Sequence, residues 1–341
     1  MKKEDLRIVF MGTPEFAVGT LSALVENGYN VVAVVTQPDK PVGRHGSILR
    51  APAVKVYAEE HGIPVLQPQK MKDESFQKQL KEYNPDVQVV VAFRMLPETV
   101  WAMPKYGTFN VHASLLPQYR GAAPINWAII NGEKQTGVTT FFLDQEIDTG
   151  NIILQKTLDI PFDADVEYVY DGLMNLGADA ALETLERLMK ENGKPETMPQ
   201  NKMVADDVVL KSAPKIFKDT CKIDWNKSVV DVYNFIRGLS PIPGAWSNVH
   251  LPNGSDLELK IYKATVSDII NDGRKTGELV VEKKHCYVVC EDKLLELQIL
   301  QPSGRKRMQA IEFLNGLRCF ISNVCKKTEK LQKKHAKYLL V

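Results

Sequence analysis

The stretch RIVFMGTPEFAVGTLSALVENGYNVVAVV, residues 7–35, decides the fold class of this chain. RIVFM (7–11) and VVAVV (31–35) are continuous apolar runs of strand length. Between them, apolar residues recur at helical spacing after Gly12-Thr13-Pro14. We expect Thr13 to cap this helix, Pro14 to be its first residue and Gly28 to close it. The pattern predicts a strand–helix–strand unit with buried strands.

The same alternation of strands and helices continues through the first half of the chain. It predicts a helix near 53–61, strands at 87–92, 108–112 and 137–143, and a long helix over 166–190. Fully apolar strands between helices indicate a Rossmann-like α/β domain with a mostly parallel sheet. The first turn has no G-x-G-x-x-G, which argues against a dinucleotide oxidoreductase.

The second half of the chain has a different texture. One helix over 229–240 precedes PIPGAW and the short strand-like runs LELKIYKATV, GELVVE, CYVVC and LLELQIL. Turn residues separate these runs, which is typical of a small β-barrel, here expected to be OB-like. We therefore expect a first domain over 1–192, a linker over 193–212 and a β-barrel-like domain with a basic tail over 213–341.

Composition restricts the function only weakly. The 341 residues are 44% hydrophobic and 25% charged, which is ordinary for a globular protein, and the formal net charge is +1. Basic residues gather at the C-terminal end. From residue 301 onward there are ten Lys and Arg but only two acidic residues, Glu312 and Glu329. Such an end suggests contact with a polyanion, or else a solvated tail.

The cysteines and the N-terminus argue against several classes of protein. The five cysteines have no C-x-x-C pair and irregular spacing, so we expect no metal site and no disulfide framework. Reduced thiols fit a cytoplasmic protein. MKKEDLRIVFMGTPEF has only a short apolar run broken by Gly12 and Pro14, so we expect no signal peptide and no membrane association.

Polar side chains follow one of the predicted strands at alternate positions. Asn110, His112 and Ser114 would share one side of the end of the strand at 108–112. Open α/β sheets bind ligands at the carboxyl ends of their strands. An amide and an imidazole there can stabilise a developing oxyanion, and Asp144 or Asp148 can orient the imidazole. A structural histidine and an ordinary turn remain the alternative from these residues alone.

NVHASLLPQYRGAAPI (110–125) together with EIDTG (146–150) resembles the folate-dependent formyltransferases. The opening RIVFMGTPEFA and the stretch from Thr36 to Pro68 resemble the members of that family that act on methionyl initiator tRNA. In the second half, IDW, RGLSPIPGAW and LQPSGRKRM resemble the second domain of those members.

The resemblance implies an activity and a set of site residues. It implies formyl transfer from 10-formyltetrahydrofolate, as co-substrate, to the α-amino group of methionyl initiator tRNA. It requires no metal and no obligate protein partner. The implied catalytic residues are Asn110, His112 and Asp148. The implied folate contacts are Ser114, Leu115, Leu116 and Pro117, together with Phe93, Arg94, Met95 and Leu96. The implied tRNA contacts are Lys40, Arg44 and Arg50 in a basic loop over 36–52, and Arg305, Lys306 and Arg307 in the second domain.

The chain departs from the family pattern at a few positions. VVVAFRMLPETV (89–100) is one residue shorter than the common pattern and has Arg94 at a glycine position, and Ala113 and Glu146 also replace glycines. We expect replacement of Arg94 by glycine to alter folate binding and to leave thermal stability nearly unchanged. Two other functions stay open: a formyltransferase for the amine of a nucleotide sugar, and a non-catalytic RNA-binding protein.

Overall fold

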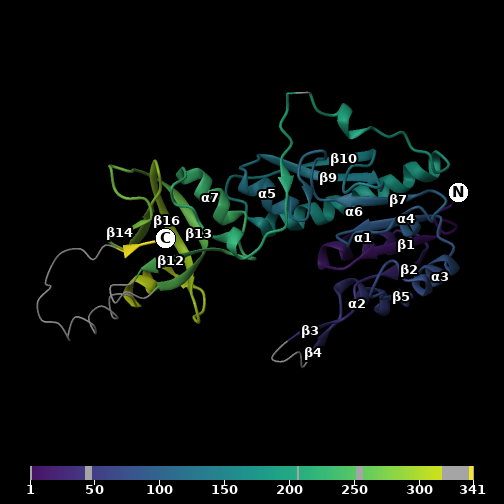
Figure 1. Ribbon diagram of the computed structural model, residues 1–341, viewed down its shortest axis with the longest axis horizontal. Helices are drawn as coiled ribbons and strands as arrows, with labels where there is room; N and C mark the ends of the chain where they lie inside the picture. The colour runs from purple at the N-terminus through teal and green to yellow at the C-terminus, as the bar shows by residue number, and fades with distance from the viewer. Residues whose placement is uncertain (1, 43–47, 206, 251–255, 317–337, 341) are drawn as a thin grey trace, which may run out of the picture. The chain divides into compact units, whose positions relative to one another are not determined.

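The computed structural model describes residues 2–42, 48–205, 207–250, 256–316 and 338–340 (Figure 1). It divides into two compact units, which are described separately. The first unit comprises Met1–Pro124, Gln135–Asp159 and Val169–Pro214, and the second comprises Ile125–Lys134, Ile160–Tyr168 and Lys215–Val341.

A seven-stranded sheet forms the centre of the first unit, in the order β10-β9-β7-β6-β1-β2-β5. Five of its strands run parallel: β1 (Ile8–Gly12), β2 (Val31–Val35), β5 (Val65–Leu66), β6 (Val87–Val91) and β7 (Thr108–His112). The last two, β9 (Gln135–Phe142) and β10 (Ile152–Asp159), add antiparallel strands at one edge. This confirms the mostly parallel, Rossmann-like sheet.

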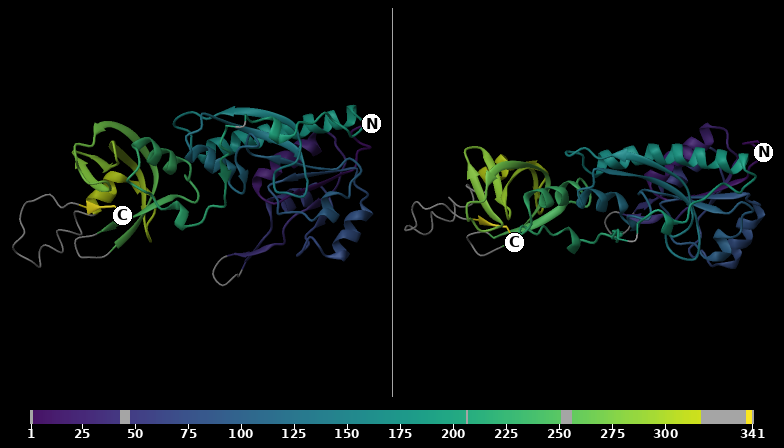
Figure 2. Two further views of the ribbon diagram at one scale, coloured as in Figure 1. Left: turned by 45° about the horizontal axis from the view of Figure 1, so that its top comes forward. Right: turned by 90° about the horizontal axis from the view of Figure 1, so that it is seen from above.

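Helices cover both faces of this sheet, because its strands are apolar on both sides. On one face, α3 (Glu74–Glu82) and α4 (Glu98–Trp101) bury Phe76, Leu80 and Val100 against side chains of β1, β2 and β6. On the other face, α6 (Val166–Lys190) packs Gly177 against Val111 and Val138, and its length along the sheet is visible in Figure 2.

Helix α1 (Glu15–Glu26) begins one residue later than expected. Pro14 is its N-cap, not its first helical residue, and Thr13 makes no cap because ψ of Pro14 is 174°, which is an extended conformation. Gly28 closes the helix at φ +75°, where its N–H donates to the carbonyl of Val25. Helix α2 (Ala53–Glu60) follows the loop after β2.

Two short strand pairs lie outside the main sheet of the first unit. Within the predicted loop over 36–52, β3 (Lys40–Val42) and β4 (Ile48–Arg50) pair as an antiparallel hairpin, which projects from the body of this unit in Figures 1 and 2. Further along, β8 (Arg120–Gly121) pairs in parallel with β11 (Ser212–Ala213). The segment after α6, with the 3₁₀ turn η2 (Gln200–Lys202), therefore belongs to the first unit.

The second unit is built on a curved antiparallel sheet. The strands run in the order β12 (Ala245–His250), β13 (Asp256–Ile270), β16 (Lys293–Pro302), β15 (His285–Val289), β14 (Glu278–Glu282) and β18 (Tyr338–Leu339), with β17 (Met308–Gln309) beside β16. A bridge between Leu340 and Val249 returns the far edge to β12, so the sheet closes on itself. The β-rich second domain is confirmed, and its OB-like character stays a prediction.

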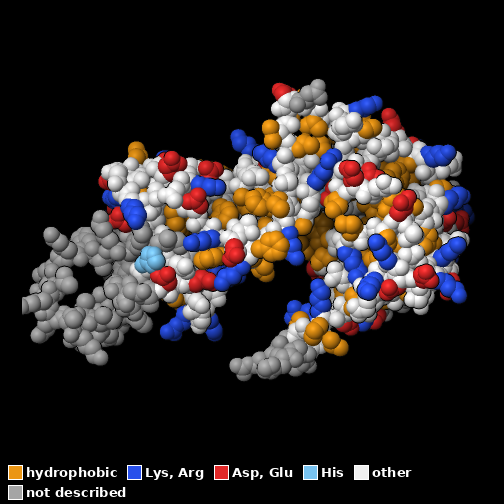
Figure 3. Space-filling view, in the orientation of Figure 1, with side chains coloured by type: hydrophobic (Ala, Val, Ile, Leu, Met, Phe, Trp, Pro, Cys, Tyr) orange, Lys and Arg blue, Asp and Glu red, His pale blue; other side chains and the backbone are white. Residues whose placement is uncertain are grey.

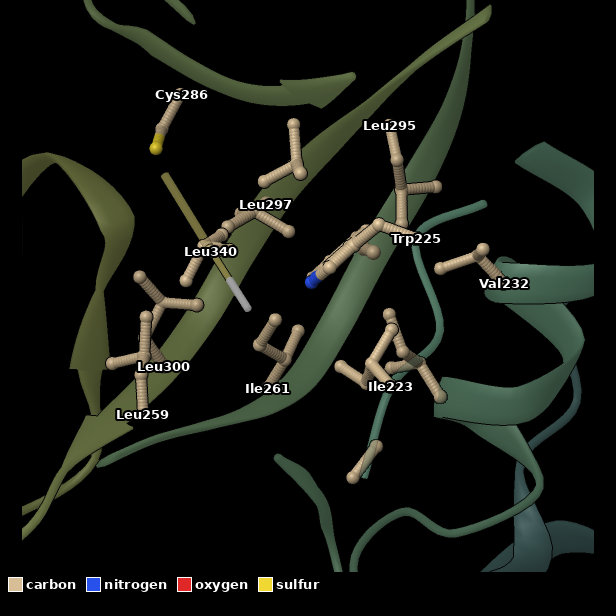
Figure 4. Packing of buried hydrophobic residues seen from close by; sticks show 14 of the residues in the cluster. Ile223, Trp225, Val232, Leu259, Ile261, Cys286, Leu295, Leu297, Leu300 and Leu340 are labelled. Carbon is tan, nitrogen blue, oxygen red and sulfur yellow. The ribbon is translucent and has the colours of Figure 1, made fainter. Parts of the chain in front are cut away.

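Apolar side chains fill the interior of the second unit (Figure 4). Trp225 lies among Ile223, Val232, Leu295 and Ile261, and its indole N–H donates to the hydroxyl of Ser247 at 3.1 Å. Burial raises the pKa of the Cys286 and Cys290 thiols to about 12, so both are protonated at neutral pH.

Two segments distant in sequence complete the second unit by packing on α7 (Val229–Arg237). Asn126, in α5 (Pro124–Ile130), donates to the carbonyl of Gly238 at 2.9 Å. The buried guanidinium of Arg237 donates to the carbonyl of Ala164 at 2.8 Å, and Phe162 stacks on Tyr233.

Among the described residues, no helix is both long and apolar enough to span a membrane.

Candidate active site

The carboxyl end of β7 carries Asn110 and His112 on one face of the strand. Asn110 is half-buried, whereas His112 is buried with its imidazole between two oxygen acceptors. Nε2 donates to the carbonyl of Tyr119 at 3.0 Å, and Nδ1 is 3.9 Å from Oδ2 of Asp148. The second distance exceeds hydrogen-bond length, and catalytic contacts of this kind commonly shorten when substrate binds.

The surroundings of the two candidate aspartates differ. Asp144 is exposed, and its Oδ1 accepts from the backbone N–H of Glu146 at 3.1 Å and the hydroxyl of Thr149 at 2.7 Å. Asp148 adopts φ +56°, and its Oδ2 accepts from the N–H of Gly121 at 3.0 Å. The geometry favours Asp148 as the partner of His112 and gives Asp144 the role of closing the loop. The catalytic role of the three residues stays a prediction.

The turn from Ser114 to Pro117 is fixed to the antiparallel strands. Thr139, in β9, donates its hydroxyl to the carbonyl of Ser114 at 2.7 Å and accepts from the N–H of Leu116 at 3.1 Å. Gln155, in β10, donates to the carbonyl of Leu116 at 2.8 Å. The conformation of the turn is therefore set by hydrogen bonds to the sheet.

The side chains of this turn divide between core and surface. Leu116 is 2% exposed and packs with Phe141 and Ile152, and Ser114 and Pro117 are buried. Leu115 keeps partial exposure. Of the two leucines expected to face folate, Leu115 is the one with accessible side-chain surface.

The segment from Phe93 to Leu96 follows β6 at the same edge of the sheet. Leu96 and part of Phe93 pack into the core, whereas Met95 is 73% exposed. Arg94 donates its guanidinium to the carbonyls of Gln69, at 2.9 Å, and Pro68. Burial lowers the pKa of Arg94. This arginine ties the segment after β6 to the segment after β5.

The order of the strands brings these segments together. Beyond β1 the chain adds β2 and β5 on one side, and it adds β6 and β7 on the other. The order thus reverses between β1 and β6, and ligands of open α/β sheets bind beside the carboxyl ends of strands at such a point. The segment 92–97 after β6 lies at this point, and the Asn110–His112 strand is the next one along the sheet.

The predicted tRNA contacts in the first unit lie on the hairpin of β3 and β4. Lys40 and Arg50 are exposed and directly opposite each other, and like charges in that position destabilise a strand pair. Ile48 and Leu49 are 62% and 68% exposed, so the hairpin combines basic and apolar surface (Figure 3). Arg44 lies outside the described residues.

A network of partly buried hydrogen bonds holds the base of the hairpin. Asp39 accepts from Lys55 at 2.8 Å and from Gln67 at 2.7 Å, and Gln67 also donates to the carbonyl of Gln37. These hydrogen bonds, from Gln67 first and then Lys55, lower the pKa of Asp39. The network fixes where the hairpin leaves the first unit.

In the second unit, Arg305, Lys306 and Arg307 are exposed between β16 and β17. Arg307 stacks on the ring of Tyr262 at 3.7 Å, and alternate outward positions of β12 and β13 add further groups. We name the resulting surface the basic–aromatic face; it comprises Lys218, Lys222, Trp246, Lys260, Tyr262 and Arg307. The basic tail over 317–337 lies outside the described residues.

Sequence reasoning missed several groups at these sites. The alternation in LELKIYK, which puts Lys260 and Tyr262 on one face, was a usable signal for the basic–aromatic face. The contact of Tyr119 had no signal in the sequence, because it is made by a backbone carbonyl, which every residue has. The contacts of Gln200 had none, because its partners are distant in sequence. Within the described ranges, no three His, Cys, Asp or Glu side chains are placed to hold a metal ion.

Comparisons with known proteins decide the family. The family model described as "Formyl transferase" matches residues 6–185, and "Formyl transferase, C-terminal domain" matches residues 215–318. The chain belongs to the formyltransferase family. A relative from Parabacteroides distasonis, named methionyl-tRNA formyltransferase, is 55% identical over 93% of this chain and 98% of its own length. One of the same name from Bacteroides thetaiotaomicron is 52% identical over 93% and 98%.

Solved structures agree with this family at the level of the fold. An N-formyltransferase from Helicobacter canadensis, in complex with folinic acid and dTDP-3-aminofucose, is 18% identical to this chain, with a TM-score of 0.60. The Helicobacter comparison covers 89% of this chain and 100% of that protein. HypX from Aquifex aeolicus, in complex with tetrahydrofolic acid, is 18% identical with a TM-score of 0.58, over 92% of this formyltransferase chain and 47% of HypX.

Proposed function

We propose that this formyltransferase moves the formyl group of 10-formyltetrahydrofolate to the α-amino group of methionyl initiator tRNA, for translation initiation. The observation that carries the proposal is 48–55% identity, over 93% of the chain, to relatives named methionyl-tRNA formyltransferase. It does not favour a nucleotide-sugar acceptor or a non-catalytic RNA-binding role.

The residues at the end of β7 fit acyl transfer to an amine. When bound, the folate supplies an activated formyl group. As the amine nitrogen bonds to the formyl carbon, negative charge grows on the formyl oxygen. The amide of Asn110 stabilises this charge by hydrogen bonding, and Nε2 of His112 does so by sharing its N–H between the Tyr119 carbonyl and the formyl oxygen. Asp148 holds the imidazole in its working orientation. The bond between the formyl carbon and the folate nitrogen then breaks, and the folate leaves without its formyl group. Overall the amine loses one proton and the folate nitrogen gains one, so no other reactant is needed.

The edge between β1 and β6 fits a flat, partly apolar ring system. Met95 offers a largely exposed apolar side chain there, Leu115 is partly exposed, and the backbone around both is fixed by hydrogen bonds to neighbouring segments. Backbone N–H and C=O groups in such a place give orientation, and apolar side chains give contact area. We assign the folate to the segments 93–96 and 114–117.

Two surfaces suit a polyanionic acceptor. The opposed Lys40 and Arg50 of the hairpin are unfavourable without an anion and favourable beside a phosphate. On the basic–aromatic face, cations alternate with Trp246 and Tyr262, a combination that binds nucleic acid through phosphates and stacking. We assign tRNA contacts to both, with Arg44, Arg305 and Lys306 as further contacts.

The test is an assay of the purified protein with 10-formyltetrahydrofolate and three acceptors: methionylated initiator tRNA, methionylated elongator tRNA and a nucleotide-linked amino sugar. We expect formylmethionyl initiator tRNA as the main product. Formylation of the amino sugar alone would overturn the acceptor. RNA binding without formyl transfer to any acceptor would overturn the enzyme and leave a binding protein.

A further inference from the structure

Gln200, in the segment that follows α6, has an unusual set of hydrogen bonds for a residue outside the predicted site. The residue is buried, with 3% of its surface exposed. The amide oxygen accepts from Nε and Nη2 of Arg120, at 3.0 and 2.6 Å. The amide nitrogen donates to the carbonyls of Asp148 and Gly150, each at 2.9 Å. All four hydrogen-bonding positions of the amide are thereby used.

The two carbonyls held by Gln200 flank Thr149 in the turn that presents Asp148. Asp148 has φ +56°, a left-handed conformation that non-glycine residues seldom adopt. One amide group that binds the carbonyls on both sides of Thr149 fixes the shape of this turn. The shape of this turn sets the direction of the Asp148 carboxylate, whose Oδ2 lies 3.9 Å from Nδ1 of His112.

The other end of the network reaches the opposite side of the imidazole. Arg120, which Gln200 binds, is the neighbour of Tyr119, whose carbonyl accepts from Nε2 of His112. Arg120 also precedes Gly121, whose N–H donates to Asp148. Gln200 therefore connects the two backbone segments that contact the two nitrogens of His112.

Attachment of the segment after α6 does not depend on Gln200. Met198 exchanges two backbone hydrogen bonds with Ile152, at 2.9 and 2.8 Å. Further along, Lys211 accepts from the N–H of Tyr119 at 2.7 Å, and β11 pairs with β8. The segment is held on both sides of Gln200, so loss of this side chain should change the turn at 148–150 more than the attachment.

We propose that Gln200 is a positioning residue for formyl transfer, which aligns Asp148 and the Tyr119 carbonyl on His112 through the turn at 148–150 and Arg120. The inference rests on the proposed function for its kinetic test. It assigns a role in the reaction to a residue of the segment between the two family-model matches, which end at 185 and resume at 215.

The test compares Gln200→Ala and Gln200→Glu with Gln135→Ala. Glutamate keeps the volume and the acceptor for Arg120 but has no N–H for the two carbonyls. Gln135 is an exposed glutamine of the same unit, and its side-chain amide donates to Asp159 at 3.0 Å, so its removal is the matched control. The measurements are kcat, KM for folate and for tRNA, and the number of folate sites per chain.

We expect both Gln200 variants to lower kcat by at least ~10-fold, since a displacement near 1 Å costs up to ~100-fold, with both KM values within about threefold. Gln135→Ala should match the wild type. If kcat falls only in proportion to the number of folate sites per chain, the loss reflects unfolded protein. Gln200 would then have a structural role, which would overturn the proposal. So would wild-type kcat in Gln200→Glu.

A second measurement needs no formyl transfer. The imidazole ¹⁵N signals of the six histidines are recorded by NMR, and the His112 signal is identified by its loss in His112→Ala. We expect Gln200→Glu to shift this signal and to leave the others in place. An unshifted signal overturns the positioning role. If the wild type formylates no acceptor, the proposed function fails, and this spectrum still decides whether Gln200 sets the surroundings of His112.

Discussion

At the scale of single residues, two carboxylates in one loop offer a controlled comparison. Asp144→Asn keeps an Oδ1 that accepts from Glu146 and Thr149, whereas Asp148→Asn places a neutral amide opposite His112. We expect Asp148→Asn to lower kcat by ~100-fold or more, as for aspartates that orient a catalytic histidine. Asp144→Asn should stay within about threefold of the wild type, since its acceptor is retained.

Steady-state kinetics with initiator tRNA measures both changes, with thermal unfolding as the control for folding. Equal losses for the two variants would mean that the loop needs both carboxylates for its shape. Asp148 would then have no special part in orienting the imidazole.

Gly121 tests the close approach of β11 to the site. A Cβ at this residue would lie 2.5 Å from the carbonyl oxygen of Ala213, and φ is +125°. We expect Gly121→Ala to push β8 away from β11 and to lower the free energy of unfolding by about 1–3 kcal/mol. It should also lower kcat, because the N–H that binds Asp148 moves. The control is Gly62→Ala, where φ is +67° and the space is open. Denaturant unfolding and kcat are measured for both, and wild-type kcat in Gly121→Ala would exclude this N–H from the mechanism.

Single residues also show how far sequence reasoning reaches. The alternate spacing of Asn110 and His112 was enough to place both on one face of a strand end. The choice between Asp144 and Asp148 required either the family resemblance or the folded loop, because both are acidic residues in the same turn-rich stretch. Gln200 was out of reach, since Arg120 and Asp148 precede it by 80 and 52 residues.

At the scale of elements, the segment after β6 alters one expectation from the sequence. Arg94 binds two backbone carbonyls after β5, so its replacement should not leave stability unchanged. We now expect Arg94→Gly to cost about 1.5–3 kcal/mol of unfolding free energy, the usual range for hydrogen bonds to a charged group. Folate affinity should fall as well, because the segment loses its tie to the strand beside it.

Arg94→Lys is the matched variant, because it keeps the charge and fewer donors. Thermal unfolding and folate binding by isothermal titration calorimetry should both be intermediate in this variant. Wild-type stability in Arg94→Gly, with weaker folate binding, would support the earlier expectation and make the two hydrogen bonds energetically unimportant.

Helices and strands differ in how well the sequence predicts them. The predicted helix over 166–190 has the bounds of α6, because apolar residues recur through all of its turns. The pairs β3–β4 and β8–β11 escaped prediction, since strands of two or three residues have no period to detect. The membership of residues 125–134 in the second unit depends on contacts with α7 that local sequence does not encode.

At the scale of the whole molecule, a formal net charge of +1 conceals an uneven surface. Lys218 and Lys222 lie over the ring of Trp246, and Arg307 lies over that of Tyr262. Glu258 pairs with Lys218 at the border of this basic–aromatic face. Local arrangement, not total charge, therefore sets the attraction for a polyanion.

The basic–aromatic face should make tRNA binding depend on salt. Each phosphate contact releases counterions, so its loss flattens the plot of log affinity against log salt by about one unit. We expect Lys222→Gln combined with Arg307→Gln to flatten the slope by about two units and to weaken initiator and elongator tRNA alike, since phosphates carry no sequence information. The control, Lys275→Gln combined with Lys284→Gln, removes the same charge from exposed positions of the same unit. Filter binding at several salt concentrations measures both slopes. Equal slopes for the two double variants would mean that the unit attracts tRNA only through its overall charge, and would remove the basic–aromatic face as a binding site.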